Sequence, residues 1–244
     1  PMENGGSTKT VDTFCVLICA LNEADQIGTV IRSALEQHPN EVIVVDDGSS
    51  DATAEIAEKN GAVVLKNRTN RGKGASLNRG FERVHEKHFD AVIVIDGDGQ
   101  HNPAEISRFI DAYQRTGIPI LVGNRMSDVR GMPLIRRYTN RFMAWVLNRL
   151  VKIYVADPPC GYRFYRADVL PFILSTEARF AFEFDVLVRA ALRHIRIDSV
   201  RISTIYNRKS RSHVAPVRDA WLLFGVVKQH FFAARNESKP LAGN

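Results

Sequence analysis

The sequence predicts a single α/β domain whose central sheet is mainly parallel and covered by helices on both faces. Apolar runs of strand length alternate with segments of helical periodicity through the first half of the 244-residue chain. These runs are continuous rather than alternating, which is typical of strands buried on both sides in a parallel sheet. No linker, internal repeat or low-complexity segment is evident, so the pattern indicates one domain.

Five strands are predicted in the first half of the chain. They lie at residues 14–21, 41–45, 62–65, 91–95 and 118–122. Segments of helical spacing separate them, which is the order of a parallel sheet connected by helices. Asp51 and Asn102 are expected to cap two of these helices, because a short polar side chain accepts a hydrogen bond from a first-turn amide. Gly61 and Gly117 stand where the same two helices are expected to end.

The second half of the chain is less regular. Helices are predicted at 132–151, 182–195 and 217–234, a short strand at 161–165, and a strand-like segment at 197–205. The last helix is amphipathic, so it either packs on the core or lies in a membrane interface. We expect a flexible leader at 1–12, one domain at 13–236 and a tail at 237–244.

The formal net charge of +6 favours an anionic partner: nucleic acid, a phosphorylated small molecule or an anionic membrane surface. The leader lacks the apolar core of a signal peptide, and the apolar stretch at 221–227 is far below the ~20 residues that span a bilayer. Cys15, Cys19 and Cys160 show no metal-site or disulfide-framework spacing. These features predict a reduced, cytoplasmic setting.

Three of the predicted strands run directly into polar clusters. The clusters are Asn22-Glu23, Asp46 to Ser50, and Asp96 to Gln100. Ligands of open parallel sheets bind beyond the carboxyl ends of the strands, so these clusters are expected to share one rim. Asp46 and Asp47 are not needed as helix caps, because Asp51 or Ser50 serves there. Hydrogen bonds to a base or ribose are the favoured interpretation.

Asp96 and Asp98 are the strongest candidates for a metal site. Residues two apart in an extended chain face the same side, about 6.6 Å apart at ~3.3 Å per residue. Gly97 and Gly99 allow the chain to bend so that the two carboxylates converge. Carboxylate oxygens suit Mg²⁺ or Mn²⁺, which take further ligands from water and substrate phosphates. The pattern therefore predicts a metal–diphosphate site, with an ordinary Asp-Gly turn as the alternative.

A second glycine-rich segment, Gly72-Lys73-Gly74, is a weaker phosphate candidate. It lacks the upstream glycine of a P-loop, and Leu77 occupies the place of the third glycine of a dinucleotide-binding motif. We interpret it as a flexible loop that opens a helix, whose backbone amides assist a phosphate at most weakly.

Three segments of the first half together resemble family-2 glycosyltransferases of the GT-A fold. They are LNEADQIGTVIRSAL at 21–35, VVDDGSSDAT at 44–53 and IDGDGQHNP at 95–103. Within that family the sequence is most similar to dolichol-phosphate mannose synthases and other polyprenyl-phosphate glycosyltransferases. The resemblance implies a Rossmann-like nucleotide-sugar-binding half at 13–125, an acceptor half at 126–215 and a C-terminal amphipathic helix at 216–235.

The resemblance also implies which residues bind the donor and the metal. Glu23 and Asp47 would contact the nucleoside, and Asp96 would lie near the ribose and diphosphate. The expected nucleotide-sugar-binding set is Leu21, Asn22, Glu23, Asp46, Asp47, Asp96, Gly97, Asp98 and Arg125. The divalent ion, Mg²⁺ or Mn²⁺, would be held by Asp98 and Gln100, with Asp96 and His213 as further candidates.

The acceptor side is implied by two arginines and a basic loop. Arg125, in VGNRM, matches an element that faces the donor and acceptor phosphates, and Arg137 resembles a second arginine of that region. The loop at 205–214 resembles one that closes over the diphosphate. It departs from the mannose synthases at Asn207 and His213, so either Arg208, Lys209 and Arg211 supply the positive charge or His213 reaches the metal.

The segment FEFDVLVRA resembles an element that carries an acid near the reaction centre. Asp185 fits that place better than Glu183. With a hydroxyl acceptor Asp185 is the candidate general base; with a phosphate acceptor, already ionised at pH 7, it would orient substrate. The alternative is an ordinary acid near a helix N-terminus. Asp98 is the other expected catalytic residue, because it holds the ion.

The implied activity is metal-dependent, inverting transfer of a sugar from a UDP- or GDP-sugar to a polyprenyl phosphate. The chain would then act as a cytoplasmic protein bound peripherally to the cytoplasmic face of a membrane. A soluble saccharide or a protein hydroxyl is the alternative acceptor. A sugar-nucleotide pyrophosphorylase is disfavoured because LNEADQ lacks its glycine-rich loop, and a nucleic-acid-binding module because acids crowd the rim.

Overall fold

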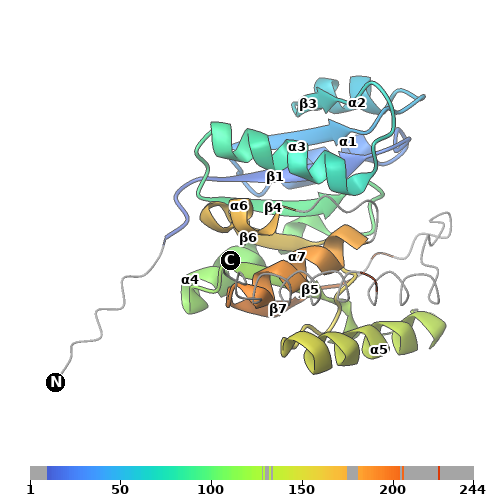
Figure 1. The fold of residues 1–244 in the computed structure, drawn as a ribbon. Coiled ribbons are helices and arrows are strands. Elements are labelled where there is room, and N and C mark those ends of the chain that lie inside the picture. The colour runs from blue at the N-terminus through green and yellow to red at the C-terminus, as the bar shows by residue number, and fades with distance from the viewer. Residues whose placement is uncertain are drawn as a thin grey trace, which may run out of the picture.

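The computed structural model describes residues 10–127, 129, 132, 134–174, 181–203, 205 and 225. Within this part of the chain, the strands form one sheet in the order β3-β2-β1-β4-β6-β5-β7. Figure 1 shows the sheet with its strands stacked from β3 at one edge to β7 at the other. The strands are β1 Phe14–Ala20, β2 Glu41–Asp46, β3 Val63–Lys66, β4 Ala91–Asp96, β5 Ile120–Asn124, β6 Arg163–Arg166 and β7 Ile197–Arg201.

The first four strands are parallel neighbours, as the sequence predicts. β1 pairs with both β2 and β4, and its interior residues from Cys15 to Ile18 are completely buried. The register pairs Ala20 with Asp46 and Cys19 with Asp96. The last residues of β1, β2 and β4 therefore lie at the same edge of the sheet, and the predicted shared rim is confirmed.

The second half of the sheet contains one reversed strand. β6 is antiparallel to both β4 and β5, whereas β7 is parallel to β5. The two parallel parts of the sheet are thus joined through β6, which corresponds to the short strand expected at 161–165. The sheet is mainly parallel overall, in agreement with the predicted fold class.

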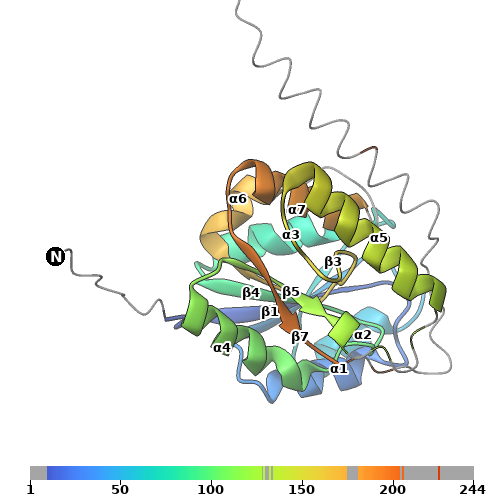
Figure 2. The ribbon, with the colours of Figure 1, turned by 90° about the horizontal axis from the view of Figure 1, so that it is seen from below.

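Helices cover both faces of this sheet. Figure 2 shows α3, α5, α6 and α7 on one side and α1, α2 and α4 on the other. The α-helices are α1 Ile27–Leu35, α2 Thr53–Lys59, α3 Lys73–Glu86, α4 Ile106–Thr116, α5 Leu134–Val151, α6 Leu170–Ile173 and α7 Ala181–Leu192. Short 3₁₀ turns occupy Pro103–Glu105, Arg125–Ser127 and Ala167–Val169. The apolar side chains between these layers form a continuous core.

Most element boundaries differ from expectation by only one or two residues. The strand expected at 118–122 begins at Ile120, because the Ile118 amide donates to the Thr116 hydroxyl and Pro119 has no amide hydrogen to donate. Asn102 caps the turn that precedes α4 by accepting a hydrogen bond from the Ala104 amide, and Gly117 ends α4 with φ 60°. The helix expected at 217–234, most of the leader and the tail lie outside the described residues.

None of the helices in the described ranges is long and apolar enough to cross a bilayer. The three cysteines are free thiols, and Cys15 and Cys160 are buried. Burial raises the pKa of each of these two thiols, so both remain protonated at neutral pH. They therefore contribute as small core residues, as the sequence suggests for Cys15.

Candidate active site

The carboxyl edge of the sheet gathers side chains from strands and helices that are far apart in the sequence. Asp96 is the last residue of β4, Lys73 is the first residue of α3, and Glu183 lies in the first turn of α7. The Lys73 Nζ lies 2.6 Å from Asp96 Oδ1 and 2.9 Å from Glu183 Oε1. One ammonium group thus joins three separate elements at the centre of the rim.

The charges of this cluster are mutually stabilised. Burial alone would lower the pKa of Lys73, but the carboxylates of Asp96 and Glu183 outweigh it and raise that pKa, so the lysine stays charged. Burial would raise the pKa of Asp96, but Lys73 lowers it well below its usual range. Glu183 is 2% exposed, and its second oxygen, Oε2, has no hydrogen-bond partner among the described residues.

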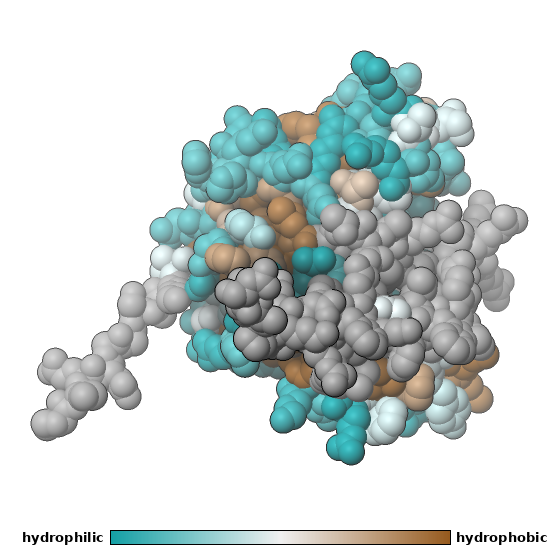
Figure 3. Space-filling view, in the orientation of Figure 1, coloured by the Kyte–Doolittle hydropathy of each residue, from teal (hydrophilic) through white to brown (hydrophobic). Residues whose placement is uncertain are grey.

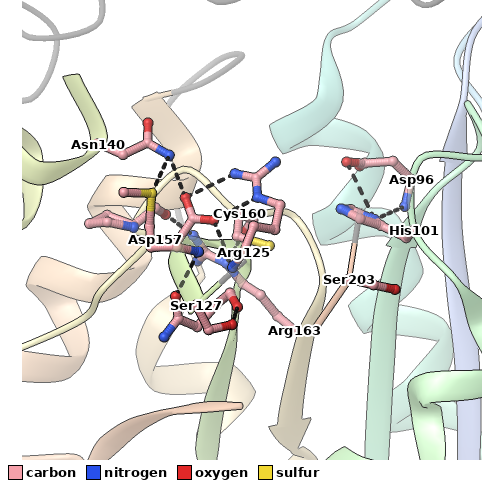
Figure 4. Close-up of polar contacts among 12 residues, drawn as sticks. Asp96, His101, Arg125, Ser127, Asn140, Asp157, Cys160, Arg163 and Ser203 are labelled. Atoms are coloured by element: carbon pink, nitrogen blue, oxygen red, sulfur yellow. Dashed lines mark hydrogen bonds and ion pairs between the residues drawn. The ribbon is translucent and has the colours of Figure 1, made fainter. Parts of the chain in front are cut away.

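His101 and Gly161 shape the other side of Asp96. Burial lowers the pKa of His101 to about 4, so its imidazole is neutral at pH 7. Its Nδ1 accepts a hydrogen bond of 3.2 Å from the Asp96 backbone amide, which fixes the end of β4 (Figure 4). A Cβ at Gly161 would lie 2.7 Å from Asp96 Oδ2 and 2.9 Å from Lys73 Nζ. The backbone therefore approaches the ion pair more closely than any other residue would permit.

Asp98 and Glu23 add negative charge to the same edge. Burial, followed by repulsion from Asp98 and Asp96, raises the pKa of Glu23 to about 7. Burial and the neighbouring Asp96 raise the pKa of Asp98. The Gln100 side-chain nitrogen donates a 2.7 Å hydrogen bond to Asp98 Oδ2, and the Gln100 amide donates to Oδ1. This hydrogen bonding holds the Asp98 carboxylate in place beside the Gln100 carboxamide.

These residues fit a divalent cation of the Mg²⁺ or Mn²⁺ kind. The donors are hard oxygens, those of the Asp98 carboxylate and the carbonyl oxygen of Gln100, and burial together with the neighbouring carboxylates raises the pKa of Glu23 and of Asp98. Among the described residues there is no group of three or more His, Cys, Asp or Glu side chains arranged for a metal. Ions of this kind commonly take water and substrate oxygens into their coordination shell.

Asp46 and Asp47 organise the loops of the rim. Asp47 is 5% exposed and accepts hydrogen bonds from the Asn67 side chain and from the backbone amides of Arg71 and Gly72. Asp46 accepts from the Ser49 amide in the turn after β2. Asp47 thereby holds the loop that delivers Lys73, so the structure gives this acid a positioning role in addition to the expected nucleoside contact.

The turn after β1 is fastened to the turn after β2. The Asn22 amide donates to the Ser49 hydroxyl, and the Asn22 side-chain oxygen accepts from the amide and hydroxyl of Ser50. Asn22 has φ 57°, a left-handed conformation that asparagine tolerates better than most residues. Leu21, 38% exposed, precedes this turn and is open to a ligand.

Arg125 belongs to a second, fully buried polar cluster at the end of β5. Its Nε lies 2.6 Å from Asp157 Oδ2, and its terminal nitrogen donates to Asp157 Oδ1 at 2.9 Å. Asn140 of α5 donates to the same carboxylate at 2.7 Å. Figure 4 shows this cluster on one side and the Asp96–His101 pair on the other. Asp157 therefore both neutralises Arg125 and connects it to α5.

The other residues expected at the site, on the acceptor side and near the reaction centre, lie in different places. Arg137 is partly exposed on α5, one turn before Asn140. Asp185 is 1% exposed and forms an ion pair of 2.6 Å with Arg189, one turn along α7. Positions 183 and 185 are about 200° apart around a helix, so Glu183 rather than Asp185 is brought to Asp96. Arg208, Lys209, Arg211 and His213 lie outside the described residues.

The sequence reasoning missed Lys73, His101 and Asp157 as parts of the rim. Lys73 belongs to the glycine-rich segment at 72–74, which fits no phosphate motif and is typical of a loop that opens a helix. The sequence feature that could have indicated its role is a lysine between two glycines at the start of the helix that precedes the strand ending at Asp96. No sequence pattern pointed to Asp157, because it comes to lie beside Arg125 only in the folded protein.

We predict that Asp157→Ala destabilises the protein by about 3–5 kcal/mol, because it leaves the buried Arg125 charge uncompensated. Urea unfolding followed by circular dichroism measures this loss. The matched control is Asp168→Ala, which breaks the exposed Arg166–Asp168 pair and costs about 1 kcal/mol or less. Equal losses for the two variants would contradict the assigned role of Asp157.

We further predict that Glu23→Gln raises the melting temperature at pH 8 and raises it much less at pH 5. The pKa of this group is about 7 in the folded protein against 4.5 for an ordinary glutamate. Unfolded chains therefore release this proton first, and stability falls as the pH rises through this interval. Thermal melts of the variant, beside the exposed control Glu82→Gln on α3, test the effect. A gain of the same size at both pH values would refute it.

Comparison with known proteins places these features in a family. The family model described as "Glycosyl transferase family 2" matches residues 15–173. The UDP-N-acetylglucosamine–dolichyl-phosphate N-acetylglucosaminyltransferase of Methanococcus voltae is 25% identical over 232 residues, covering 86% of this chain and 92% of that protein. The polyprenol monophosphomannose synthase of Mycolicibacterium smegmatis is 28% identical over 178 residues, covering 69% of this chain and 67% of that protein.

Solved structures show the same fold. The glucosyl-3-phosphoglycerate synthase of Mycobacterium tuberculosis, in complex with Mn²⁺, uridine diphosphate and glucosyl-3-phosphoglycerate, superposes with a TM-score of 0.64. It is 20% identical in sequence, and the match covers 89% of this chain and 79% of that chain. The expected GT-A fold is thereby confirmed. The family match spans both acidic clusters and the strands that carry them, and the chain is a glycosyltransferase of family 2.

Proposed function

We propose that the protein transfers a sugar from a UDP- or GDP-sugar to a polyprenyl phosphate, with a divalent metal ion at Asp98. The observation that carries this proposal is the meeting of two features at one edge of the sheet. An acidic rim suited to a metal and a diphosphate lies there, and the Arg125 cluster links this edge to α5, whose outer face is apolar and basic.

The donor is held by the ends of β1, β2 and β4. The turns after β1 and β2 are fastened together through Asn22 and the two serines, which leaves Leu21 and Glu23 beside the nucleoside position. Asp98 and Gln100 would hold the divalent ion, which when bound neutralises charge on the leaving diphosphate. Asp96, fixed by His101 and Lys73, lies next to that position.

The chemistry would be a single displacement. An oxygen of the acceptor phosphate forms a bond to the anomeric carbon of the sugar while the bond from that carbon to the diphosphate breaks, so the configuration inverts. A phosphate acceptor is already ionised at pH 7 and needs no strong general base. This is consistent with the burial of Asp185 and with its ion pair to Arg189.

The acceptor proposal is supported by the outer face of α5. This face is formed by the exposed apolar residues Leu134, Ile135, Tyr138, Phe142 and Trp145. The helix carries four arginines and no acidic residue between positions 134 and 151. Figure 3 shows apolar side chains along the lower margin of the molecule, where α5 lies in Figure 1. A basic helix with an exposed apolar face is typical of binding to an anionic membrane interface.

The helix α5 lies between the proposed membrane surface and the rim, so binding to a membrane would affect access of the acceptor to the rim. Asn140 on its inner side contacts Asp157, which holds Arg125 at the end of β5. A membrane against the outer face would therefore bring lipid phosphates close to the rim. Peripheral attachment of this kind accords with relatives whose names include dolichyl-phosphate and polyprenol transferases.

A transfer assay tests the proposed activity. Thermal shifts with UDP- and GDP-sugars in the presence of Mn²⁺ first identify the donor, and its radiolabelled form is then incubated with undecaprenyl or dolichyl phosphate. We expect metal-dependent label in the organic phase, and its loss below about 1% in Asp98→Asn, because the ion loses its carboxylate ligand. The control Asp111→Asn, at an exposed position of α4, should keep full activity. Transfer to a soluble saccharide but not to lipid phosphate would contradict the acceptor.

Vesicle sedimentation tests the membrane surface separately. We expect the protein to bind phosphatidylglycerol vesicles at low salt, and the double variant Phe142→Ser/Trp145→Ser to bind at least about tenfold more weakly, because two aromatic side chains no longer enter the interface. Phe172→Ser removes an equally exposed aromatic from α6 and should leave binding unchanged. If both variants sediment like the unaltered protein, α5 is not the membrane-binding element.

A further inference from the structure

We infer that Glu105 is a positioning residue of the metal site, and that it acts through Ser203 and Ile205, which follow β7. The inference deepens the proposed function, since it rests on a divalent ion held by Asp98. Glu105 is 5% exposed and has no part in the donor or acceptor contacts described above. It ends the 3₁₀ turn Pro103–Glu105, which follows the metal motif along the chain.

Glu105 fastens the chain that leaves β7 to the turn after the metal motif. The Ser203 amide donates to both carboxylate oxygens, at 3.1 and 3.0 Å, and the Ser203 hydroxyl donates to Oε2 at 3.3 Å. Arg108 donates to Oε1 at 2.6 Å and to the Arg201 carbonyl at 3.3 Å. A buried carboxylate is costly unless its oxygens accept hydrogen bonds, and here Ser203, 98 positions along the chain, supplies most of them.

The chain fastened by Glu105 contacts the metal motif directly. The Ile205 amide donates a 3.0 Å hydrogen bond to the Gln100 carbonyl oxygen. Gln100 in turn donates to both oxygens of the Asp98 carboxylate, at 3.0 Å from its amide and at 2.7 Å from its side chain. A continuous connection therefore runs from Glu105 through Ser203, Ile205 and Gln100 to the proposed metal ligand.

The metal motif needs such support because its backbone is irregular. Residues 97–102 lie between the end of β4 and the turn at Pro103–Glu105, so neither strand nor helix hydrogen bonding fixes them. Gly99 within them has φ 72°, and glycine is the residue with the greatest backbone freedom. Metal affinity depends on how firmly the ligands are held, so groups that hold the ligands from outside contribute to it. By fixing the Gln100 carbonyl, Glu105 keeps Asp98 in its ligating position.

The test measures Mn²⁺ binding by electron paramagnetic resonance, with UDP or GDP added if the ion does not bind alone. Glu105→Met should bind Mn²⁺ about fivefold more weakly, the change that corresponds to the loss of one ordinary hydrogen bond. Glu105→Gln keeps an oxygen for the Ser203 amide and should restore most of the affinity. Arg108→Met breaks the ion pair with Glu105 from its exposed side and leaves the Ser203 bonds, so this control should stay within about twofold.

A second set of variants tests the connection through Ile205. Ile205→Pro removes the amide hydrogen that the Gln100 carbonyl accepts, whereas Ile205→Ala keeps it. We expect Ile205→Pro to weaken Mn²⁺ binding about as much as Glu105→Met, and Ile205→Ala to leave it unchanged. The double variant Glu105→Met/Ile205→Pro should be no weaker than either single variant, because both changes interrupt the same connection. Effects that multiply in the double variant would overturn the inference.

Binding of UDP or GDP in the presence of a chelator separates this role from a general disturbance of the rim. It should change less than about twofold in Glu105→Met, and a fall equal to that of Mn²⁺ binding would contradict the assigned role. Undiminished Mn²⁺ binding in folded Glu105→Met overturns the inference and leaves the proposed function intact. If that variant does not fold, equal Mn²⁺ binding by Ile205→Pro and Ile205→Ala has the same consequence. If the unaltered protein binds no Mn²⁺ with or without nucleotide, the proposed metal site and this inference fail together.

Discussion

The ion pairs that Lys73 makes with Asp96 and Glu183 are the interactions on which the architecture of the rim depends. They join the start of α3, the end of β4 and the first turn of α7. Without the lysine, two largely buried carboxylates would face each other, and one of them would have to take up a proton or separate from the other. With it, Asp96 stays ionised beside Asp98.

The acceptor side depends on a comparable buried pair. Asp157 is completely buried and receives hydrogen bonds from Arg125 and Asn140, so it joins the end of β5 to α5. The two clusters lie at the same edge because β6 runs antiparallel between β4 and β5 and leaves the flanking strands pointing the same way. The family-2 fold thus places a donor half and an acceptor half along one rim.

Some residues of this rim hold its loops and side chains in position, and others remain available to a ligand. The positioning residues accept hydrogen bonds from backbone amides at the rim; they are Asp46, Asp47, Asn22 and His101. Asp98, Glu23 and Lys73 retain partial exposure, and their charges are only partly balanced by the protein. Such a division is expected where a ligand brings both a metal ion and a diphosphate to the site.

The alternation of strands and helices and the shared rim could be predicted from the sequence, because continuous apolar runs, helix caps and the polar residues that follow each strand are local signals. The same locality explains what it missed. Lys73 is 23 residues from Asp96 and 110 from Glu183, and the choice of Glu183 over Asp185 depends on the rotation of α7 against the sheet. The exposed apolar face of α5 could not be predicted either, because the spacing of apolar residues along a helix does not show which of its faces packs against the rest of the protein. Only the packing of α3, α5 and α7 on the sheet decided these points, since ion pairs and burial depend on distances in space.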